Sequence, residues 1–286
     1  MKKIYGCLPM LLLISCCFFT GDLYPSPLFP TVINPRNAAG RETFSFAVVG
    51  DSQPSGETGK QPEVFKRIIE EINKSGADFM VHLGDKIYGS KDVNVVRRQY
   101  AEYGDVIKKL KIPVHYVVGN HEINGVKENE ELHKEKFGTL YFSFEHKNCF
   151  FIVLNTEFVG SEAAVKGEQL SWLKSELEKG RGCRHIFVFL HRPLFSVLFA
   201  KKNDAQQFSS KEHRDLLAGL FNKYNVSAVF AGHEHIFHSE RHNGLLQIIS
   251  GGGGGPFHFA PAFHHYLIVE VTGTTAVIRP IVVGKE

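Results

Sequence analysis

Residues 44–51, FSFAVVGD, form a run rich in aromatic and β-branched residues that ends in Gly50-Asp51. The pattern recurs in residues 77–85, ADFMVHLGD, and in residues 113–120, PVHYVVGN. Such runs, bounded by turn residues, are typical of buried β-strands. The segments between them carry apolar residues at helical spacing. This alternation of strands and helices predicts a layered α/β fold.

The second half of the chain continues the alternation. Further β-type runs cover residues 141–144, 149–154, 186–190, 226–231, 245–249, 266–271 and 276–283. The first two are separated by a polar turn and predict a hairpin. Five consecutive glycines, residues 251–255, cannot stabilise a strand, so we expect them to turn or to let backbone segments approach closely. We expect one domain over residues 44–286.

Residues 1–20 have the features of an export signal. Lys2 and Lys3 form a basic start, and the apolar run that follows is too short to span a bilayer as a mature helix. The sequence LISC (residues 13–16) is similar to a bacterial lipobox, in which Cys16 is lipidated, whereas simple secretion would discard that cysteine. We expect a periplasmic, cell-surface or secreted protein, with a lipid on Cys16 as its candidate membrane tether and residues 21–43 as a proline-rich linker.

The composition is that of a globular protein, with 43% hydrophobic and 22% charged residues. The formal net charge is +3, and removal of Lys2 and Lys3 with an export signal would lower it by two. A balance so close to neutral does not imply a nucleic-acid partner.

Two cysteines, Cys149 and Cys183, lie at the starts of apolar runs. In an oxidising compartment they would be free to form a disulfide if the two strands are neighbours. Two buried thiols are the alternative interpretation, because free cysteine packs as a small hydrophobic residue.

Polar side chains follow five of the predicted strands. They are Asp51, Asp85, Asn120, His191 and His233. Because open α/β sheets bind ligands at the carboxyl ends of their strands, we expect these side chains to converge. Carboxylate, imidazole and amide groups without thiolate favour Fe, Zn, Mn or Mg. His233 and His235 are two residues apart, so on a turn they would face two metals that share Asp85, as two-metal sites ~3.5–4 Å apart require.

Together these residues carry a family resemblance. The motifs are Gly50-Asp51, Gly84-Asp85-x-x-Tyr88, Gly119-Asn120-His121-Glu122, His191 and Gly232-His233-x-His235. Over about residues 44–235 the chain resembles the calcineurin-like metallophosphoesterases, and within them most closely the purple acid phosphatases, whose tyrosine phenolate binds a ferric ion. The resemblance implies an α/β (α+β) sandwich of four layers, α/β/β/α, with two mixed β-sheets and a metal site at the C-terminal ends of strands.

The resemblance also implies a ligand set. The first metal would take Asp51, Asp85, Tyr88 and His235, and the second Asp85, Asn120, His191 and His233. The implied ions are Fe(III) with Zn, Fe(II) or Mn. Many family members have histidine where this chain has Gln53, but in the purple acid phosphatases that position is not a ligand and the tyrosine completes the coordination. Gln53 therefore stays an alternative ligand or a substrate contact.

The implied activity is metal-dependent hydrolysis of phosphoesters, most readily small phosphomonoesters, by a hydroxide that bridges the two metals. His121 resembles the family's non-ligand histidine, which would donate a proton to the leaving oxygen, and Glu122 would orient His121 or hold its proton. A phosphodiesterase acting on cyclic nucleotides or lipid headgroups is the alternative enzyme. A surface binding protein that has lost turnover is a third interpretation.

Overall fold

The computed structural model describes residues 30–33, 42–197, 208, 210–258 and 260–284. The expected export signal, and Cys16 with it, lies outside the described residues. The elements are β1 (Thr31–Ile33), β2 (Thr43–Val49), α1 (Glu63–Ile72), β3 (Phe79–His82), α2 (Val93–Ile107), β4 (Val114–Tyr116), α3 (Asn120–Ile123), α4 (Lys127–Phe137), β5 (Phe142–His146), β6 (Cys149–Val153), α5 (Gly167–Lys179), η1 (Gly180–Gly182), β7 (His185–Leu190), α6 (Lys211–Lys223), β8 (Ala228–Ala231), β9 (Phe237–His242), β10 (Leu245–Ser250), β11 (His265–Thr272) and β12 (Thr275–Val282).

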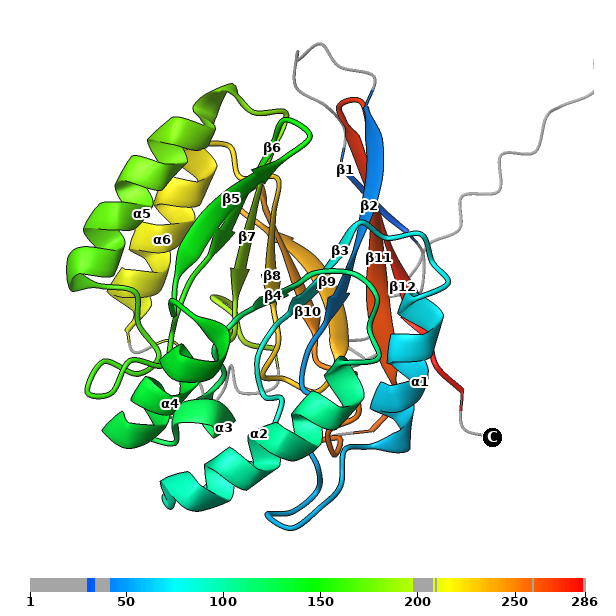
Figure 1. Cartoon of the computed structure of the whole chain (residues 1–286). Helices are drawn as coiled ribbons and strands as arrows, with labels where there is room; N and C mark the ends of the chain where they lie inside the picture. The colour runs from blue at the N-terminus through cyan, green and yellow to red at the C-terminus, as the bar shows by residue number, and fades with distance from the viewer. Residues whose placement is uncertain (1–29, 34–41, 198–207, 209, 259, 285–286) are drawn as a thin grey trace, which may run out of the picture.

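Two six-stranded mixed sheets pack face to face (Figure 1). The first has the order β1-β12-β11-β2-β3-β4, in which β2, β3 and β4 are parallel and the other pairs antiparallel. The second has the order β5-β6-β7-β8-β10-β9, with a parallel centre and antiparallel edges. The predicted pair of mixed sheets is confirmed.

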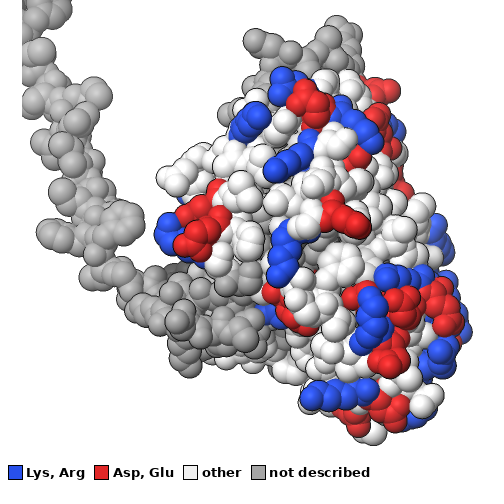
Figure 2. Space-filling view, turned by 90° about the vertical axis from the view of Figure 1, so that its left-hand side faces the viewer, with Lys and Arg blue, Asp and Glu red and all other residues white. Residues whose placement is uncertain are grey.

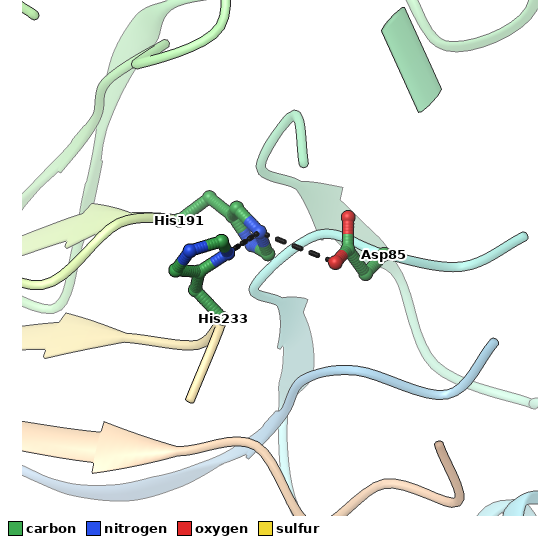
Figure 3. Close-up of side chains that lie close together, drawn as sticks. All are labelled: Asp85, His191 and His233. Carbon is green, nitrogen blue, oxygen red and sulfur yellow. Dashed lines mark hydrogen bonds and ion pairs between the residues drawn. The ribbon is translucent and has the colours of Figure 1, made fainter. Parts of the chain in front are cut away.

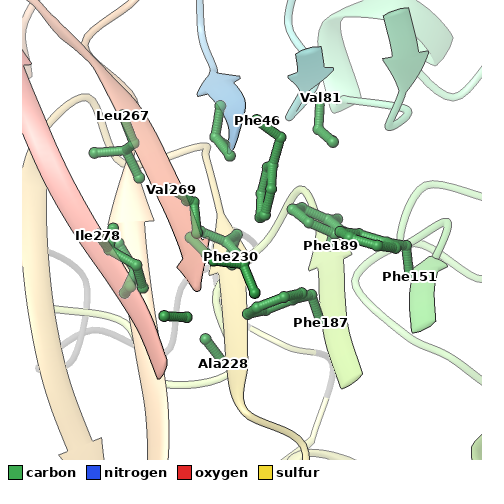
Figure 4. Close-up of a cluster of buried hydrophobic side chains, with 14 of the residues drawn as sticks. Phe46, Val81, Phe151, Phe187, Phe189, Ala228, Phe230, Leu267, Val269 and Ile278 are labelled. Carbon is green, nitrogen blue, oxygen red and sulfur yellow. The ribbon is translucent and has the colours of Figure 1, made fainter. Parts of the chain in front are cut away.

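The period of two along β2 divides its side chains between two cores. Phe46 points into the core between the sheets (Figure 4). Val48 belongs to the same core, whereas Ala47 and Val49 belong to the core beneath the helices. The ring of Phe46 lies 5.4 Å from that of Phe151 in the opposite sheet, in an edge-on arrangement. A fully buried phenylalanine of this kind stabilises the fold by about 3–5 kcal/mol relative to alanine.

Helices cover the outer face of each sheet, which completes the four predicted layers (Figure 1). α1 and α2 pack on the first sheet through side chains such as Phe65 and Tyr103, and α5 and α6 pack on the second through Leu173 and Phe221. On the face formed by α5 and α6, basic and acidic side chains are interspersed (Figure 2). Within the described part of the chain, no helix is long and apolar enough to span a membrane.

The fold departs from the expectations at two places. Thr31–Ile33, inside the expected linker, is an edge strand paired with β12, because its β-branched residues suit a strand and Ile33 is buried against the sheet. The helix Lys127–Phe137 was not expected, since only a narrow stripe of its mostly charged sequence is apolar. Of the two interpretations left open for the cysteines, the structure has free thiols rather than a disulfide, with Cys149 buried and Cys183 partly buried.

Candidate metal centre

Three of the predicted ligands share an unusual backbone conformation. Asp51, Asp85 and His233 have positive φ angles of 60°, 54° and 69°, in the left-handed region. Each follows a strand and a glycine, so the chain reverses sharply and turns the side chain toward the edge of the sheet. A left-handed non-glycine residue costs about 1–3 kcal/mol, and such residues cluster at functional sites.

The close approach of these loops requires glycine at two further places. A Cβ on Gly119 would lie 2.2 Å from Oδ1 of Asp85, and a Cβ on Gly253 would lie 2.4 Å from the carbonyl oxygen of Gly50. The second contact explains part of the glycine run, because the amide of Gly253 donates to that carbonyl at 2.8 Å. Of the two expectations for the glycine run, close approach of backbone segments is therefore confirmed.

One group of donors joins the two sheets. Nε2 of His191 lies 3.3 Å from Oδ2 of Asp85 and 3.1 Å from Nδ1 of His233 (Figure 3). The same nitrogen lies 3.0 Å from Oδ1 of Asn120. Asp85, His191 and His233 are buried, and their ligand atoms all lie within 4.8 Å of one another. The structure thus brings together the four side chains predicted for the second metal.

A second group shares Asp85 with the first. The ligand atoms of Asp51, Asp85 and His235 also lie within 4.8 Å of one another, and Nε2 of His235 is 3.5 Å from Oδ1 of Asp51. Asp51 in addition accepts hydrogen bonds from the amide of His233 at 2.8 and 3.1 Å. Asp85 is therefore placed to contribute to both groups.

Backbone carbonyls orient two of the imidazoles. Nδ1 of His191 lies 2.9 Å from the carbonyl oxygen of Leu83, and Nδ1 of His235 contacts the carbonyl oxygen of Pro256. When Nδ1–H donates to these carbonyls, the lone pair of each Nε2 points toward the carboxylates. Outer-shell carbonyls of this kind are the usual partners of metal-binding histidines.

The pKa values reflect a cluster of charges in a buried place. Burial disfavours the charged form of His191, yet the carboxylate of Asp85 beside it raises its pKa to about 9. Burial also opposes ionisation of Asp85, but the His191 and His121 rings hold the pKa of that carboxyl well below its usual range. Asp85 is thus an anion at neutral pH and could serve as a metal ligand. Buried carboxylate, imidazole and amide donors at these distances fit two hard or borderline cations.

The structure places the two candidates for the remaining position of the first group differently. Gln53 is buried, and its Nε2 lies 3.2 Å from Nε2 of His235. Tyr88 is 40% exposed, and its ring faces His121 at a centroid distance of 5.9 Å. The structure brings Gln53 against the first group, whereas Tyr88 as a ligand stays a prediction.

His121 and Glu122 are adjacent in sequence but face different neighbours. The His121 side chain is half-buried, its Nδ1 contacts the carbonyl oxygen of Tyr88, and its Nε2 lies 3.9 Å from Oδ2 of Asp85. Glu122 is fully buried and accepts hydrogen bonds from the amides of Asp85 and Gly119 at 2.9 and 2.7 Å. Glu122 thus holds the Asp85 backbone, and the carbonyl of Tyr88, rather than Glu122, orients His121.

Sequence reasoning missed Glu157. This buried carboxylate accepts hydrogen bonds from Nε and Nη2 of Arg192 at 2.7 and 3.0 Å, which brings Nη1 of Arg192 to 3.4 Å from Nε2 of His233. The signal was available, because Glu157 follows β6 as Asp85 follows β3, as a polar residue just beyond the carboxyl end of a strand. His82, which alternates with apolar neighbours, is a core histidine bonded to Ser52 at 3.0 Å.

Comparison with known proteins agrees with this geometry. The sequence profile of the calcineurin-like phosphoesterases matches residues 44–237, which carry all of the predicted ligands. The chain belongs to the calcineurin-like phosphoesterase family. It is 29% identical to the rat serine/threonine-protein phosphatase CPPED1 over 234 residues, which cover 78% of this chain and 74% of the relative.

Two more distant comparisons agree with this result, the first in sequence and the second in fold. This calcineurin-like phosphoesterase is 26% identical to human tartrate-resistant acid phosphatase type 5 over 227 residues, covering 68% of this chain and 67% of the relative. Among solved structures, the purple acid phosphatase PPD1 from yellow lupin superposes with a TM-score of 0.67 at 17% identity, covering 84% of this chain and 52% of that protein. The present chain thus spans about half of the lupin enzyme.

Proposed function

We propose that the chain hydrolyses small phosphomonoesters with two metal ions held at the candidate metal centre. The observation that carries this proposal is the position of Asp85, whose carboxylate belongs to two buried groups of donors. A shared carboxylate is what a pair of closely spaced cations needs.

The ligands follow from the contacts. Asp51, Asp85 and His235 would hold the first ion, with Gln53 or Tyr88 as the further ligand, and Asp85, Asn120, His191 and His233 would hold the second. Oxygen and imidazole donors without thiolate support Fe(III) paired with Zn, Fe(II) or Mn. When bound, the ions would supply Lewis-acid chemistry, lowering the pKa of water and drawing charge from the phosphoryl oxygens.

The charge of the centre favours a monoester over a diester. The described candidate ligands include two carboxylates, Asp51 and Asp85, together with amide groups and with imidazoles, which bind a metal in their neutral form. Two divalent ions with these two carboxylates would leave a charge of about +2, which a tyrosinate and a hydroxide would each lower by one and a ferric ion would raise by one. A phosphomonoester dianion gains more from a positive centre than a diester monoanion does.

The chain's own residues would position and protonate the substrate. The Nε2 edge of His121 is on the side of Asp85, so this imidazole is placed to give a proton to the leaving oxygen. Glu157 holds Arg192 so that its Nη1 lies 3.4 Å from Nε2 of His233, and this contact would restrict the orientation of the His233 ring. Both contacts depend on side chains that the fold presents at the same edge of the two sheets.

The test is hydrolysis of para-nitrophenyl phosphate and of its bis ester by the purified protein, before and after chelation and with each metal returned. We expect turnover that is lost on chelation, restored by metal and faster on the monoester. Faster hydrolysis of the bis ester would assign the phosphodiesterase alternative, and no turnover with any metal would favour a binding protein.

We also propose that the protein is exported and anchored through a lipid on Cys16. The support is the sequence of residues 1–20 alone, with its basic start, apolar run and LISC motif. The test is the membrane fraction of cells that express the wild type or Cys16→Ser. A wild type that is soluble outside the cytoplasm would leave simple secretion, and a cytoplasmic wild type would remove both forms of export.

A further inference from the structure

A cavity of about 210 Å³ lies beside the second group of metal ligands. Its lining includes Asn120, Ile123, Asn124, Glu157, Glu162 and Arg192. Two of these residues also border the centre, because Oδ1 of Asn120 lies 3.0 Å from Nε2 of His191 and Nη1 of Arg192 lies 3.4 Å from Nε2 of His233. The cavity is therefore adjacent to the position at which a phosphoryl group would meet the second ion.

The charged side chains that line the cavity, one arginine and two glutamates, carry a net negative charge. The guanidinium of Arg192 is matched by the two oxygens of Glu157, at 2.7 and 3.0 Å. Glu162 accepts a hydrogen bond from the amide of Gly160 at 2.9 Å, and in the part of the chain that the structure describes no ion pair to its carboxylate is found. The carboxylate of Glu162 is thus left over in the lining, and it is exposed to solvent.

The size of the cavity limits the group that fits. Pockets for drug-sized ligands measure about 300–1,000 Å³, so 210 Å³ suits a short alcohol better than a nucleoside or a lipid headgroup with its glycerol. The lining is mainly polar, with Ile123 as its hydrophobic member and the Asn124 amide exposed. A small leaving group with a polar or positive end satisfies this lining.

We propose that this cavity is the leaving-group subsite of the phosphatase and that it selects phosphomonoesters of small amino alcohols, with Glu162 facing the substrate ammonium. The inference rests on the proposed function. In the reaction, an oxygen from water forms the new bond to phosphorus, the bond from phosphorus to the ester oxygen breaks, and the alcohol leaves with one proton. The ammonium takes no part in the chemistry and serves only recognition.

The size of the expected effect follows from exposure. Glu162 is solvent-exposed, and exposed charge pairs contribute about 0.2–1 kcal/mol; the upper part of this range, about 0.4–1 kcal/mol, corresponds to a two- to fivefold preference in kcat/KM. The preference should also shrink in salt, because a Debye length of ~3 Å at 1 M ionic strength screens such a pair.

The experiment compares O-phosphoethanolamine with propyl phosphate, which has a methyl group in place of the ammonium. We expect wild-type protein to prefer the amino ester about two- to fivefold at low salt and Glu162→Gln to bring the ratio near one. Glu102→Gln, an exposed glutamate on α2 outside this cavity, is the matched control and should keep the wild-type ratio. Calorimetric binding of 2-aminoethylphosphonate and propylphosphonate to the metal-loaded protein gives the same comparison without turnover.

The outcomes separate this inference from the proposed function. Turnover of para-nitrophenyl phosphate with a wild-type ratio near one, or with the same ratio in Glu162→Gln, would overturn the subsite alone. If the metal-loaded wild type hydrolyses no phosphomonoester, both the subsite and the proposed function are overturned. Because the salt dependence is measured on the unaltered protein, a preference that survives 1 M salt would contradict a charge contact even if the variant failed to fold.

Discussion

The ammonium of Lys86 lies 3.4 Å from the carboxylate of Glu122, and neither side chain is exposed to solvent. Lys86 also donates a hydrogen bond to the carbonyl oxygen of Val117 at 3.2 Å. Glu122 accepts hydrogen bonds from the backbone amides of Asp85 and Gly119. The ion pair therefore joins the loop after β3 to α3, which follows β4, next to the Asp85 carboxylate that both metal ions would share. Burial lowers the pKa of Lys86, and the neighbouring Glu122 carboxylate opposes this shift.

Glu122→Ala should destabilise the protein and weaken metal binding together. Removing one partner of a buried ion pair typically costs about 3–5 kcal/mol, because the other charge is left buried without compensation. The amides of Asp85 and Gly119 would also lose their acceptor. We expect the free energy of unfolding to fall by this amount in urea titrations of the chelated protein, and metal affinity to fall about 10–100-fold by calorimetry.

Two variants control for this effect. Asp105→Ala breaks an exposed pair with Lys108, in which the two side chains are 70% and 67% exposed, and should change stability by less than about 1 kcal/mol. Glu122→Gln keeps one acceptor oxygen, so its free energy of unfolding should lie between those of the wild type and Glu122→Ala. Equal stability of Glu122→Ala and Asp105→Ala would show that the buried pair does not support the fold.

Much of the architecture was predictable from the sequence. The strand runs before Asp51, Asp85 and His191 are buried on both faces, so they appear as continuous apolar segments that are easy to recognise. Because parallel strands end at a common edge, the positions of the polar residues after them were also determined. The burial of the strands and the convergence of the polar side chains after them thus both follow from apolar runs that end in a polar residue.

Other features depend on contacts that no local pattern encodes. The direction in which Glu122 points is set by three amides from two loops, and the sequence neighbour His121 suggested a different partner. α4 was not predicted, because most of its surface is solvated and its buried residues are few. The choice between Gln53 and Tyr88 likewise depends on backbone placement rather than on residue type.

Gln53 and Tyr88 make different predictions for the first metal. Since the Gln53 amide lies 3.2 Å from Nε2 of His235, we expect Gln53→Ala to lower the affinity of one of the two ions about 10–100-fold. Calorimetric titration of the metal-free protein with zinc would show the weakened affinity as the loss of one of two binding steps. Tyr88→Phe tests the other residue, through the visible absorption of the iron-loaded protein.

The two results together assign the ligand. A violet colour that disappears in Tyr88→Phe while the second ion stays bound would make the phenolate a ligand, and would require Tyr88 to turn inward from its exposed position. Unchanged absorption in Tyr88→Phe with a lost zinc step in Gln53→Ala would assign the amide instead. If both variants bind two ions normally, neither side chain completes the first site.

Stability should fall as the pH drops from about 6.5 to about 4. Burial holds the pKa of His265 at about 4, and His265 bonds Ser250 at 3.1 Å inside the fold. Between the folded value of about 4 and the ordinary value of 6.5, the unfolded chain binds a proton that the folded chain does not, so acid favours unfolding. The slope contributed by this residue is at most about 1.4 kcal/mol per pH unit. Urea unfolding at pH 7.0, 6.0 and 5.0 measures it.

His265→Asn isolates this residue from the other titrating groups. Asparagine does not ionise, so the variant should be less stable than the wild type at pH 7 but lose less stability on acidification. His213→Asn on α6 is the control, since that side chain is only half-buried. Parallel curves for the wild type and His265→Asn would show that His265 is not a source of acid sensitivity.

His121→Ala should slow hydrolysis without releasing metal, and the loss should depend on the leaving group. The ring lies 3.9 Å from Oδ2 of Asp85 and is half-buried, so its removal leaves the ligand set intact and opens little buried space. A general acid typically contributes about 10²–10⁴-fold, and the contribution grows as the leaving oxygen becomes more basic. We expect a loss near 10³-fold with propyl phosphate and a smaller loss with para-nitrophenyl phosphate, whose phenolate leaves without a proton. Equal losses on the two esters, with metal content unchanged, would assign His121 to binding rather than to proton transfer.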